Sequence, residues 1–333
     1  MQSTRNKLIK LLEQSESEYV SGQVLSDYLN ISRSAIWKHM KELEKDGYTI
    51  EGKPRKGYRI IASPHKVSEN TLRWGLHTEW LGKTIIHKKK TASTQKIAHQ
   101  VAQDGAKHGT VIIADEQTEG RGRMNRPWHS TKEQGIWLSI LLRPNMLPVL
   151  TPQLTLLTAT VLADVIDELT DVTPQIKWPN DILIHGKKMA GILTELQAEQ
   201  DQIQYLIIGI GMNINQRKAD LPEQLQHKAT SLRIETGQKW DLTPFTQRLL
   251  MEFEKTYTSY MKNGFSEVKN KWESYGFKIG QPISIQTMND QWKAIFSGIA
   301  DDGALLIKNL DGSMEKLYSA EIDWFDEGAE NNE

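Results

Sequence analysis

A cluster of arginine and glycine in the segment 116–130, EQTEGRGRMNRPWHS, is the first sign of chemistry in the chain. Arg121, Arg123 and Arg126 fall within six positions, with no acidic residue among them. Glycine lets the backbone approach an anion closely, and guanidinium groups suit phosphate or carboxylate oxygens. The segment has no Walker A ending and no clear helix after its glycines, so it predicts an anion-binding loop of another type. A solvated surface loop is the alternative.

Two further segments carry polar residues where strands begin or end. The segment 177–195, KWPNDILIHGKKMAGILTE, predicts a rigid Trp-Pro turn and then two strands joined at His-Gly. Asp181 and Lys188 fall near the two ends of this hairpin, where they could share a small site; a turn acid and a surface lysine are the alternative. The segment 209–215, GIGMNIN, predicts a strand end where small residues allow close approach and Asn213 offers an amide. A buried strand followed by a loop explains that pattern equally well.

Positive charge is concentrated at the N-terminal end. Residues 1–65 hold 11 Lys/Arg against 8 Asp/Glu, although the whole chain has a net charge of −1. Apolar periodicity predicts three helices here, the third from Arg33 to about Lys45, and then a basic hairpin, YTIEGKPRKGYRI. This order is typical of a winged helix-turn-helix, which binds DNA or, alternatively, protein. The candidate DNA contacts are Ser32, Arg33, Ser34, Lys38, Lys41, Lys53, Arg55 and Lys56. Trp37 fits a core position as well as a contact.

The rest of the chain changes from alternating strands and helices to strands alone. Strands are predicted at 111–117, 135–142, 175–184, 189–197 and 204–214, and helices at 95–103, 153–169 and 244–261. From residue 278 onward, short strands divided by Asn-Asp and Asp-Gly turns predict a small SH3-like barrel.

Composition excludes several classes of protein. The chain has 333 residues and no cysteine, so disulfides, thiolate metal sites and cysteine nucleophiles are excluded. The absence of cysteine agrees with a reducing cytoplasm, the location that we expect. No run of 18 apolar residues occurs, so no membrane span is expected.

The motifs GRGRMNRPW, KWPNDI, KMAGILTE and GIGMNIN, in this order, closely resemble the biotin protein ligase family. ASTQ (92–95) and KATSL (228–232) match two further segments of that family, and the flanking domains resemble its ligase–repressor branch. The resemblance implies an α+β multidomain chain: an N-terminal winged helix-turn-helix, a central mixed α/β ligase core of the class II synthetase-like type, and a C-terminal SH3-like β-barrel. The expected domains are 1–65, 66–276 and 277–326, with a disordered tail at 327–333.

The resemblance also implies a two-step activity. Biotin and ATP would form biotinyl-5′-adenylate and pyrophosphate, with Mg²⁺ bridging the phosphates, and a lysine of a biotin carboxyl-carrier domain would then take the biotin. No covalent enzyme intermediate is required. A homodimer would bind operator DNA and repress biotin genes. The alternatives are a lipoate-type ligase and a biotin-sensing repressor without ligase activity.

The family motif assigns roles position by position. Lys188, Arg121 and Arg123 would screen the reacting anions, and Asp181 would assist the incoming amine. The implied contacts of biotin and adenylate are Ser93, Thr94, Gln95, Gln117, Arg121, Gly122, Arg123, Trp128, Lys188 and Asn213. No residue is assigned as a metal ligand. The chain departs from the family at 124–125, where Met-Asn replaces the usual Arg-Gly; asparagine tolerates left-handed backbone, so we expect the loop still to close.

Overall fold

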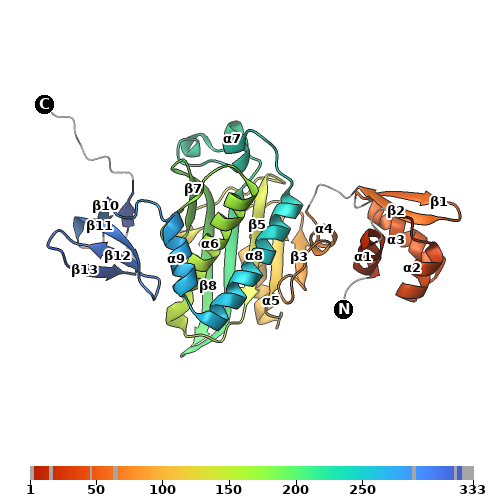
Figure 1. The fold of residues 1–333 in the computed structure, drawn as a ribbon, viewed down its shortest axis with the longest axis horizontal. Helices are drawn as coiled ribbons and strands as arrows, with labels where there is room; N and C mark the ends of the chain where they lie inside the picture. The colour runs from red at the N-terminus through yellow and green to blue at the C-terminus, as the bar shows by residue number, and fades with distance from the viewer. Residues whose placement is uncertain are drawn as a thin grey trace. The chain divides into compact units, whose positions relative to one another are not determined.

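The computed structural model describes residues 4–14, 18–45, 47–62, 67–286, 290–318 and 321–324. They belong to two compact units (Figure 1). The first unit comprises the chain up to Thr78 together with Asp241–Arg248, and the second comprises the remainder. The predicted boundary at 65–66 and the predicted tail at 327–333 lie outside the described residues.

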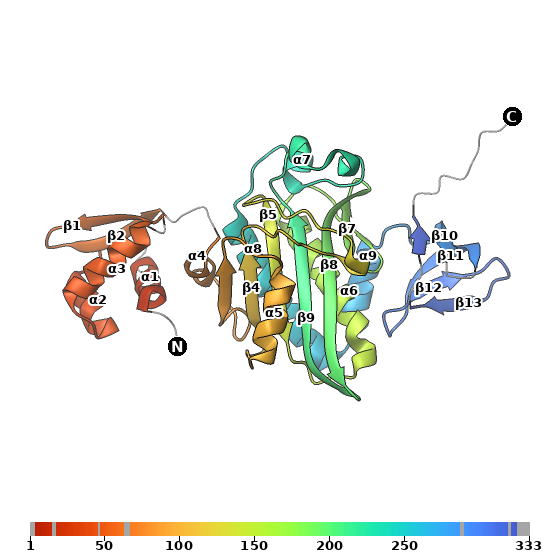
Figure 2. The same cartoon turned by 180° about the vertical axis from the view of Figure 1, so that it is seen from behind.

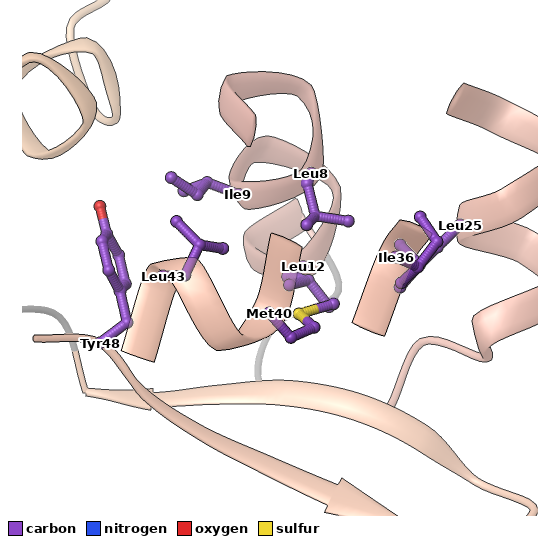
Figure 3. Close-up of a cluster of buried hydrophobic side chains, with 8 residues drawn as sticks. All are labelled: Leu8, Ile9, Leu12, Leu25, Ile36, Met40, Leu43 and Tyr48. Atoms are coloured by element: carbon purple, nitrogen blue, oxygen red, sulfur yellow. The ribbon is translucent and has the colours of Figure 1, made fainter. Parts of the chain in front are cut away.

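The first unit consists of a bundle of three helices, a hairpin and a short fourth helix. Its elements are α1 (Thr4–Gln14), α2 (Gly22–Leu29), α3 (Arg33–Lys45), β1 (Thr49–Lys53), β2 (Gly57–Ala62) and α4 (Glu69–Arg73). Apolar residues at helical spacing close its core, which Figure 3 shows: Leu8, Ile9, Leu12, Leu25, Ile36, Met40, Leu43 and Tyr48. Helix α3 has the predicted bounds, and Trp37 is 53% exposed on it, so this tryptophan is not part of the core.

Serine caps begin α2 and α3, and a glycine sets the position of the hairpin. The Ser21 hydroxyl accepts a hydrogen bond from the Val24 amide at the start of α2, and the Ser32 hydroxyl does the same for Ala35 in α3. Gly57 has a φ of +113°, and a Cβ there would lie 2.0 Å from the Val20 carbonyl oxygen. A glycine is therefore required where the hairpin meets the chain before α2.

A seven-stranded mixed sheet forms the centre of the second unit (Figure 2). Its order is β3 (Ile85–Lys88), β4 (Thr110–Ala114), β5 (Gly135–Leu142), β9 (Gln202–Asn213), β8 (Lys187–Glu199), β7 (Asp181–Ile184) and β6 (Gln175–Lys177). Strands β3 and β4 are parallel, and every other neighbouring pair is antiparallel. Helix α5 (Thr94–Gln103) covers one face, and α6 (Thr151–Leu169) with α9 (Ser266–Tyr275) covers the other. The other helices are α7 (Leu232–Thr236) and α8 (Leu242–Asn263), whose first residues group with the first unit.

The segment 175–184 is two strands rather than the single strand that its apolar residues predicted. Strands β6 and β7 pair with each other around a turn that contains Trp178 and Pro179. Proline has no amide hydrogen to donate to a neighbouring strand, which favours a turn at this point.

Helix α6 is apolar around most of its circumference because it is buried. Residues Pro148–Leu169 are long and apolar enough to cross a bilayer, but 67% of the apolar window is buried in the protein. A core helix under a sheet meets the same length and composition test.

A small antiparallel sheet follows the mixed sheet in the chain. Its order is β13 (Met314–Leu317), β12 (Leu305–Lys308), β11 (Gln291–Ile299), β10 (Pro282–Gln286) and β14 (Glu321–Asp323). The domain boundary predicted at 276–277 falls between α9 and β10. Lys269 on α9 pairs with Asp301 at 2.8 Å, and the Trp178 indole donates to the Gly303 carbonyl at 3.3 Å, so the small sheet contacts the core.

Candidate functional site

A cleft of about 1010 Å³ opens on the mixed sheet of the second unit. The loop between β4 and β5, the first turn of α5, the turn before β7, and strands β8 and β9 form its walls. The small sheet adds Gln286, Ile322 and Trp324. This volume is large enough for a ligand the size of a nucleotide.

Positive charge dominates the lining of this cleft. Among the lining residues that the structure describes, Asp181 is the only acid. The basic residues are Arg121, Arg123, Arg126, Lys177 and Lys188. A concave site with this imbalance favours a ligand that carries several negative charges.

Lys188 and Asp181 meet across the β7–β8 hairpin. The Lys188 Nζ lies 2.7 Å from Asp181 Oδ1 and 5.3 Å from the centre of the Trp128 ring. The backbone of Lys188 is fixed as well, because its amide donates to the Lys228 carbonyl at 2.8 Å and its carbonyl accepts from the Thr230 amide at 2.9 Å. The two residues therefore share one small site, as their spacing allowed.

The arginine loop folds back on itself. The Gly122 amide donates to the Arg126 carbonyl at 2.8 Å, and Met124 and Asn125 between them have φ of 54° and 56°. Asparagine adopts this left-handed conformation readily, whereas methionine does so at a cost. The loop thus keeps a tight reversal with residues other than Arg-Gly.

Arg123 lies where neighbouring atoms and charges act on its guanidinium. Desolvation by surrounding protein atoms lowers the pKa of its guanidinium, although the residue as a whole is exposed. The Asp181 carboxylate opposes this shift, and the positive charge of Arg126 adds to it. An anion bound between Arg123 and Arg126 would relieve their mutual repulsion.

Glycines on β9 let two side chains lie flat on the floor of the cleft. A Cβ on Gly211 would lie 2.6 Å from the Trp128 ring, and a Cβ on Gly209 would lie 2.9 Å from the Gln95 amide carbon. The close approach predicted for the segment 209–215 is therefore an approach of protein side chains.

A hydrogen-bonded chain lines the opposite wall. The Gln117 amide oxygen accepts from the Thr94 amide at 2.8 Å and from the Thr94 hydroxyl at 3.1 Å, while its nitrogen donates to Ser130. Ser139 donates to the Thr94 hydroxyl at 2.8 Å. These bonds hold Thr94 and Gln117 in one orientation each.

The structure brings most of the predicted ligand-contact and catalytic residues together. Ten of these residues line the cleft: Ser93, Thr94, Gln95, Gln117, Arg121, Gly122, Arg123, Trp128, Asp181 and Lys188. Asn213 is not among the lining residues; its amide donates to the Thr230 carbonyl at 3.1 Å and accepts from Gln216 at 3.1 Å. Its contacts thus fix the segment 228–232 rather than open into the cleft.

Glu195 was not singled out from the sequence, yet it contacts two cleft residues. Its carboxylate lies 2.9 Å from Arg121 Nη2 and 2.8 Å from Gln95 Nε2. Residues that alternate along a strand share a face, and Gly191, Leu193 and Glu195 do so on β8. This alternation is the sequence signal that could have placed Glu195 on the same face as the cleft residues of β8.

A second concave surface lies in the first unit, between α3 and the β1–β2 hairpin. It encloses about 900 Å³, and five of the predicted DNA contacts line it: Arg33, Ser34, Lys41, Lys53 and Arg55. Trp37 lines it too, whereas Ser32, Lys38 and Lys56 do not. Arg33, Trp37 and Lys41 are four residues apart and therefore share one face of α3.

Two of the hairpin cations share one carboxylate partner. Glu51 accepts from Tyr19 at 2.5 Å and pairs with Arg59 at 2.7 Å and Lys53 at 3.3 Å. The hydrogen bond from Tyr19 is the main cause that lowers the pKa of the Glu51 carboxyl to about 2, with Arg59 and Lys53 adding to it and desolvation opposing it. Arg55 and Lys56, at the hairpin turn, are the cations best placed to meet an external anion.

These two units define a protein that joins a helix-turn-helix domain to an α+β core with a cationic cleft. The sequence profile of the Biotin/lipoate A/B protein ligase family matches residues 88–213. Profiles of a helix-turn-helix domain and of the biotin protein ligase C-terminal domain match residues 4–59 and 278–324.

Whole-chain relatives carry both parts. The chain is 47% identical over 324 residues to the bifunctional ligase/repressor BirA of Bacillus subtilis, which covers 97% of this chain and 99% of that protein. It is 28% identical to BirA of Escherichia coli over 95% of each chain. The solved biotin protein ligase from Aquifex aeolicus in complex with biotin and ATP matches with a TM-score of 0.64 at 31% identity, over 72% of this chain and 98% of that one. The chain belongs to the bifunctional ligase/repressor family of biotin protein ligases.

Proposed function

We propose that the cleft joins biotin to ATP and passes the activated biotin to a lysine of a biotin carboxyl-carrier domain. The main support for this proposal is the charge of the cleft, because five cations and one carboxylate line it around the glycines of β9. Biotin carboxylate and ATP are both anions, and such reactants need cations between them. The match to a ligase solved with biotin and ATP supports the same substrates.

In the first step, a carboxylate oxygen of biotin attacks the α-phosphorus of ATP. The bond from that phosphorus to the bridging oxygen breaks, and pyrophosphate leaves. Lys188, Arg121 and Arg123 would stabilise the negative charge that gathers on the phosphoryl oxygens. Lys188 is already held by Asp181 and by its backbone, so little reorganisation is needed when the substrates bind.

In the second step, the amine of the carrier lysine attacks the acyl carbon of biotinyl-adenylate. The bond from that carbon to the phosphate oxygen breaks, AMP leaves, and the amine loses a proton. Asp181, which pairs with Lys188, is the carboxylate of the cleft and would guide the amine and accept its proton. No covalent bond to the enzyme is required.

Mg²⁺ would enter with the nucleotide. Among the residues that the structure describes, no group of three or more His, Cys, Asp or Glu could hold a metal ion. Magnesium on ATP phosphates needs only one or two protein carboxylates, and Asp181 is the cleft residue that could supply one. The metal would neutralise phosphate charge.

Biotin-dependent exchange of pyrophosphate into ATP tests the ligase assignment. Purified protein with biotin, ATP and magnesium should incorporate labelled pyrophosphate, and omission of biotin should abolish the exchange. Exchange with lipoate but none with biotin would indicate a lipoate-type ligase. Exchange with neither compound would favour the alternative of a biotin-sensing repressor without ligase activity.

The arginine loop should become protected when the adenylate forms. Arg123 is exposed and is followed by methionine, so trypsin should cut the empty loop readily after it, whereas Arg126 precedes a proline and is resistant to trypsin. An anion that pairs with these guanidinium groups would order the loop. We expect slower cleavage after Arg121 and Arg123 with biotin and ATP together than with either alone. Equal cleavage rates in all three conditions would contradict this expectation.

We also propose that the first unit binds operator DNA and that the protein acts as a homodimer in the cytoplasm. The groove between α3 and the hairpin carries cations from both elements, which suits a phosphate backbone. A single helix-turn-helix makes a small contact, so two copies on a pseudo-palindrome are expected. The helix-turn-helix profile match supports the DNA-binding half.

Adenylate should strengthen the dimer. Ordering of the cationic loop would remove an entropic cost from self-association, and this would couple biotin supply to DNA binding. Sedimentation should show a lower dissociation constant for adenylate-bound protein than for empty protein. The same constant for both states would remove the coupling.

A further inference from the structure

Glu195 stands behind the cleft and holds two of its lining residues. Oε2 of its carboxylate lies 2.8 Å from Gln95 Nε2 and 3.2 Å from His99 Nε2, and Oε1 lies 2.9 Å from Arg121 Nη2. Gln95 and Arg121 line the cleft, whereas Glu195 does not. The Glu195 carboxylate therefore fixes two side chains that can contact a ligand, although Glu195 itself does not line the cleft.

The contacts of Gln95 leave only one orientation for its amide. On one side of the amide lie two acceptors, the Glu195 carboxylate and the Leu193 carbonyl, the latter at 3.3 Å. Only the NH₂ group can face two acceptors, so the amide oxygen must face the other way. This assignment follows from the partners and not from the labelling of the amide atoms.

The oxygen of the Gln95 amide is then a buried acceptor without a partner. Gln95 is 4% exposed, and its Oε1 has no hydrogen-bond partner among the described residues. The amide lies over Gly209 on the cleft floor. A buried polar atom of this kind is expected to find its partner in a ligand.

Arg121, like Gln95, has one side-chain atom held by Glu195 and another without a partner. Its Nη2 is held by Glu195, and its buried Nε has no hydrogen-bond partner among the described residues. One carboxylate thus holds both Arg121 and Gln95.

We propose that Glu195 is a positioning residue that fixes the hydrogen-bond polarity of the biotin site. By binding the NH₂ group of Gln95, it makes Gln95 present an acceptor, which selects a ligand whose ring carries an N–H donor. The ureido ring of biotin carries two such groups, and the ring of lipoate carries none. The proposal rests on the ligase function proposed above and adds the feature by which the site recognises a cyclic urea.

The test compares biotin with two cyclic carbamate analogues, in each of which one ureido N–H is replaced by oxygen. The replacement preserves size but turns a donor into an acceptor. In pyrophosphate exchange, wild-type protein should prefer biotin over one of the analogues by at least about tenfold in kcat/KM, because two acceptors would face each other. Glu195→Gln can donate to the Gln95 oxygen and so frees the amide to turn over. The preference should then fall at least fivefold, whatever happens to the overall rate.

Two further variants complete the design. Gln95→Met keeps the length of the side chain and removes the acceptor, so it should reduce the preference to the same extent, and the double variant should reduce it no further. Glu199→Gln is the matched control, because Glu199 lies on the same strand, is exposed, and bonds Gln204 outside the cleft. It should retain the wild-type preference.

Each outcome decides a separate question. An unchanged preference in an active Glu195→Gln protein overturns the role of Glu195. If that variant fails to fold, as judged by its Tm, Gln95→Met decides, and an unchanged preference there overturns the proposal as well. Absence of biotin-dependent exchange in wild-type protein would instead contradict the ligase function.

Discussion

Lys188→Ala is expected to slow adenylate formation by about 10²–10³-fold, the loss that follows removal of one preorganised group beside a developing charge. The amine of Lys188 is held by Asp181 at 2.7 Å and lies over the Trp128 ring. Its charge should matter more in the transition state than in the binding of biotin, so kcat should fall more than KM rises. Pyrophosphate exchange measures both quantities.

Lys187→Ala is the matched control for this variant. Lys187 precedes Lys188 on β8 and is not among the residues that line the cleft. The exchange rate of Lys187→Ala should stay within a few-fold of wild type, and both variants should keep the wild-type Tm within a few degrees because neither side chain is buried. Undiminished adenylation by Lys188→Ala would show that Lys188 is an ordinary surface lysine.

Lys188→Ala should also fail to repress, but only because it no longer makes the co-repressor. Preformed biotinyl-adenylate, or a stable analogue, should restore much of its DNA binding. Failure of this rescue would mean that Lys188 has a role in the response to adenylate besides its formation.

Most of the architecture could be predicted because the signals were local. The bounds of α3 follow from a serine cap and apolar residues at helical spacing, and β5 follows from a run that is apolar except for Ser139. Helix α9 has less of this signal, since Val268 and Trp272 are its only buried residues among those described, and it was not predicted. The short edge strand β3 was missed for a similar reason, since only Ile85 of its four residues is buried.

The site was predictable in its residue types and not in its contacts. Spacing suggested that Asp181 and Lys188 could meet, but the register of β7 and β8 decides that they do. The partners of Arg121 and Gln95 lie 74 and 100 residues along the chain, at Glu195. Such pairs depend on the order of strands in the sheet, which local periodicity does not contain.

Replacement of Arg33 and Arg55 together by alanine is expected to weaken operator binding by about 10²-fold at roughly 0.1 M salt, with ligase turnover near wild type. The two residues line the groove from opposite sides, Arg33 on α3 and Arg55 on the hairpin turn. Glu51 pairs with the neighbouring hairpin cations Lys53 and Arg59, whereas Arg55 is exposed at the turn, where its charge can meet DNA. Each phosphate contact that is lost lowers the number of counterions released on DNA binding by about one.

The salt dependence separates phosphate contacts from base contacts. If both arginines bind phosphate, the slope of log K against log salt should decrease in magnitude by about 2 per protomer, and affinity should fall equally for operator and random DNA. A loss confined to the operator, with an unchanged slope, would assign the arginines to base edges instead. Lys7→Ala serves as the control, because Lys7 is exposed on α1 and does not line the groove. Normal affinity and slope in the double variant would show that DNA, if bound, uses another surface of the first unit.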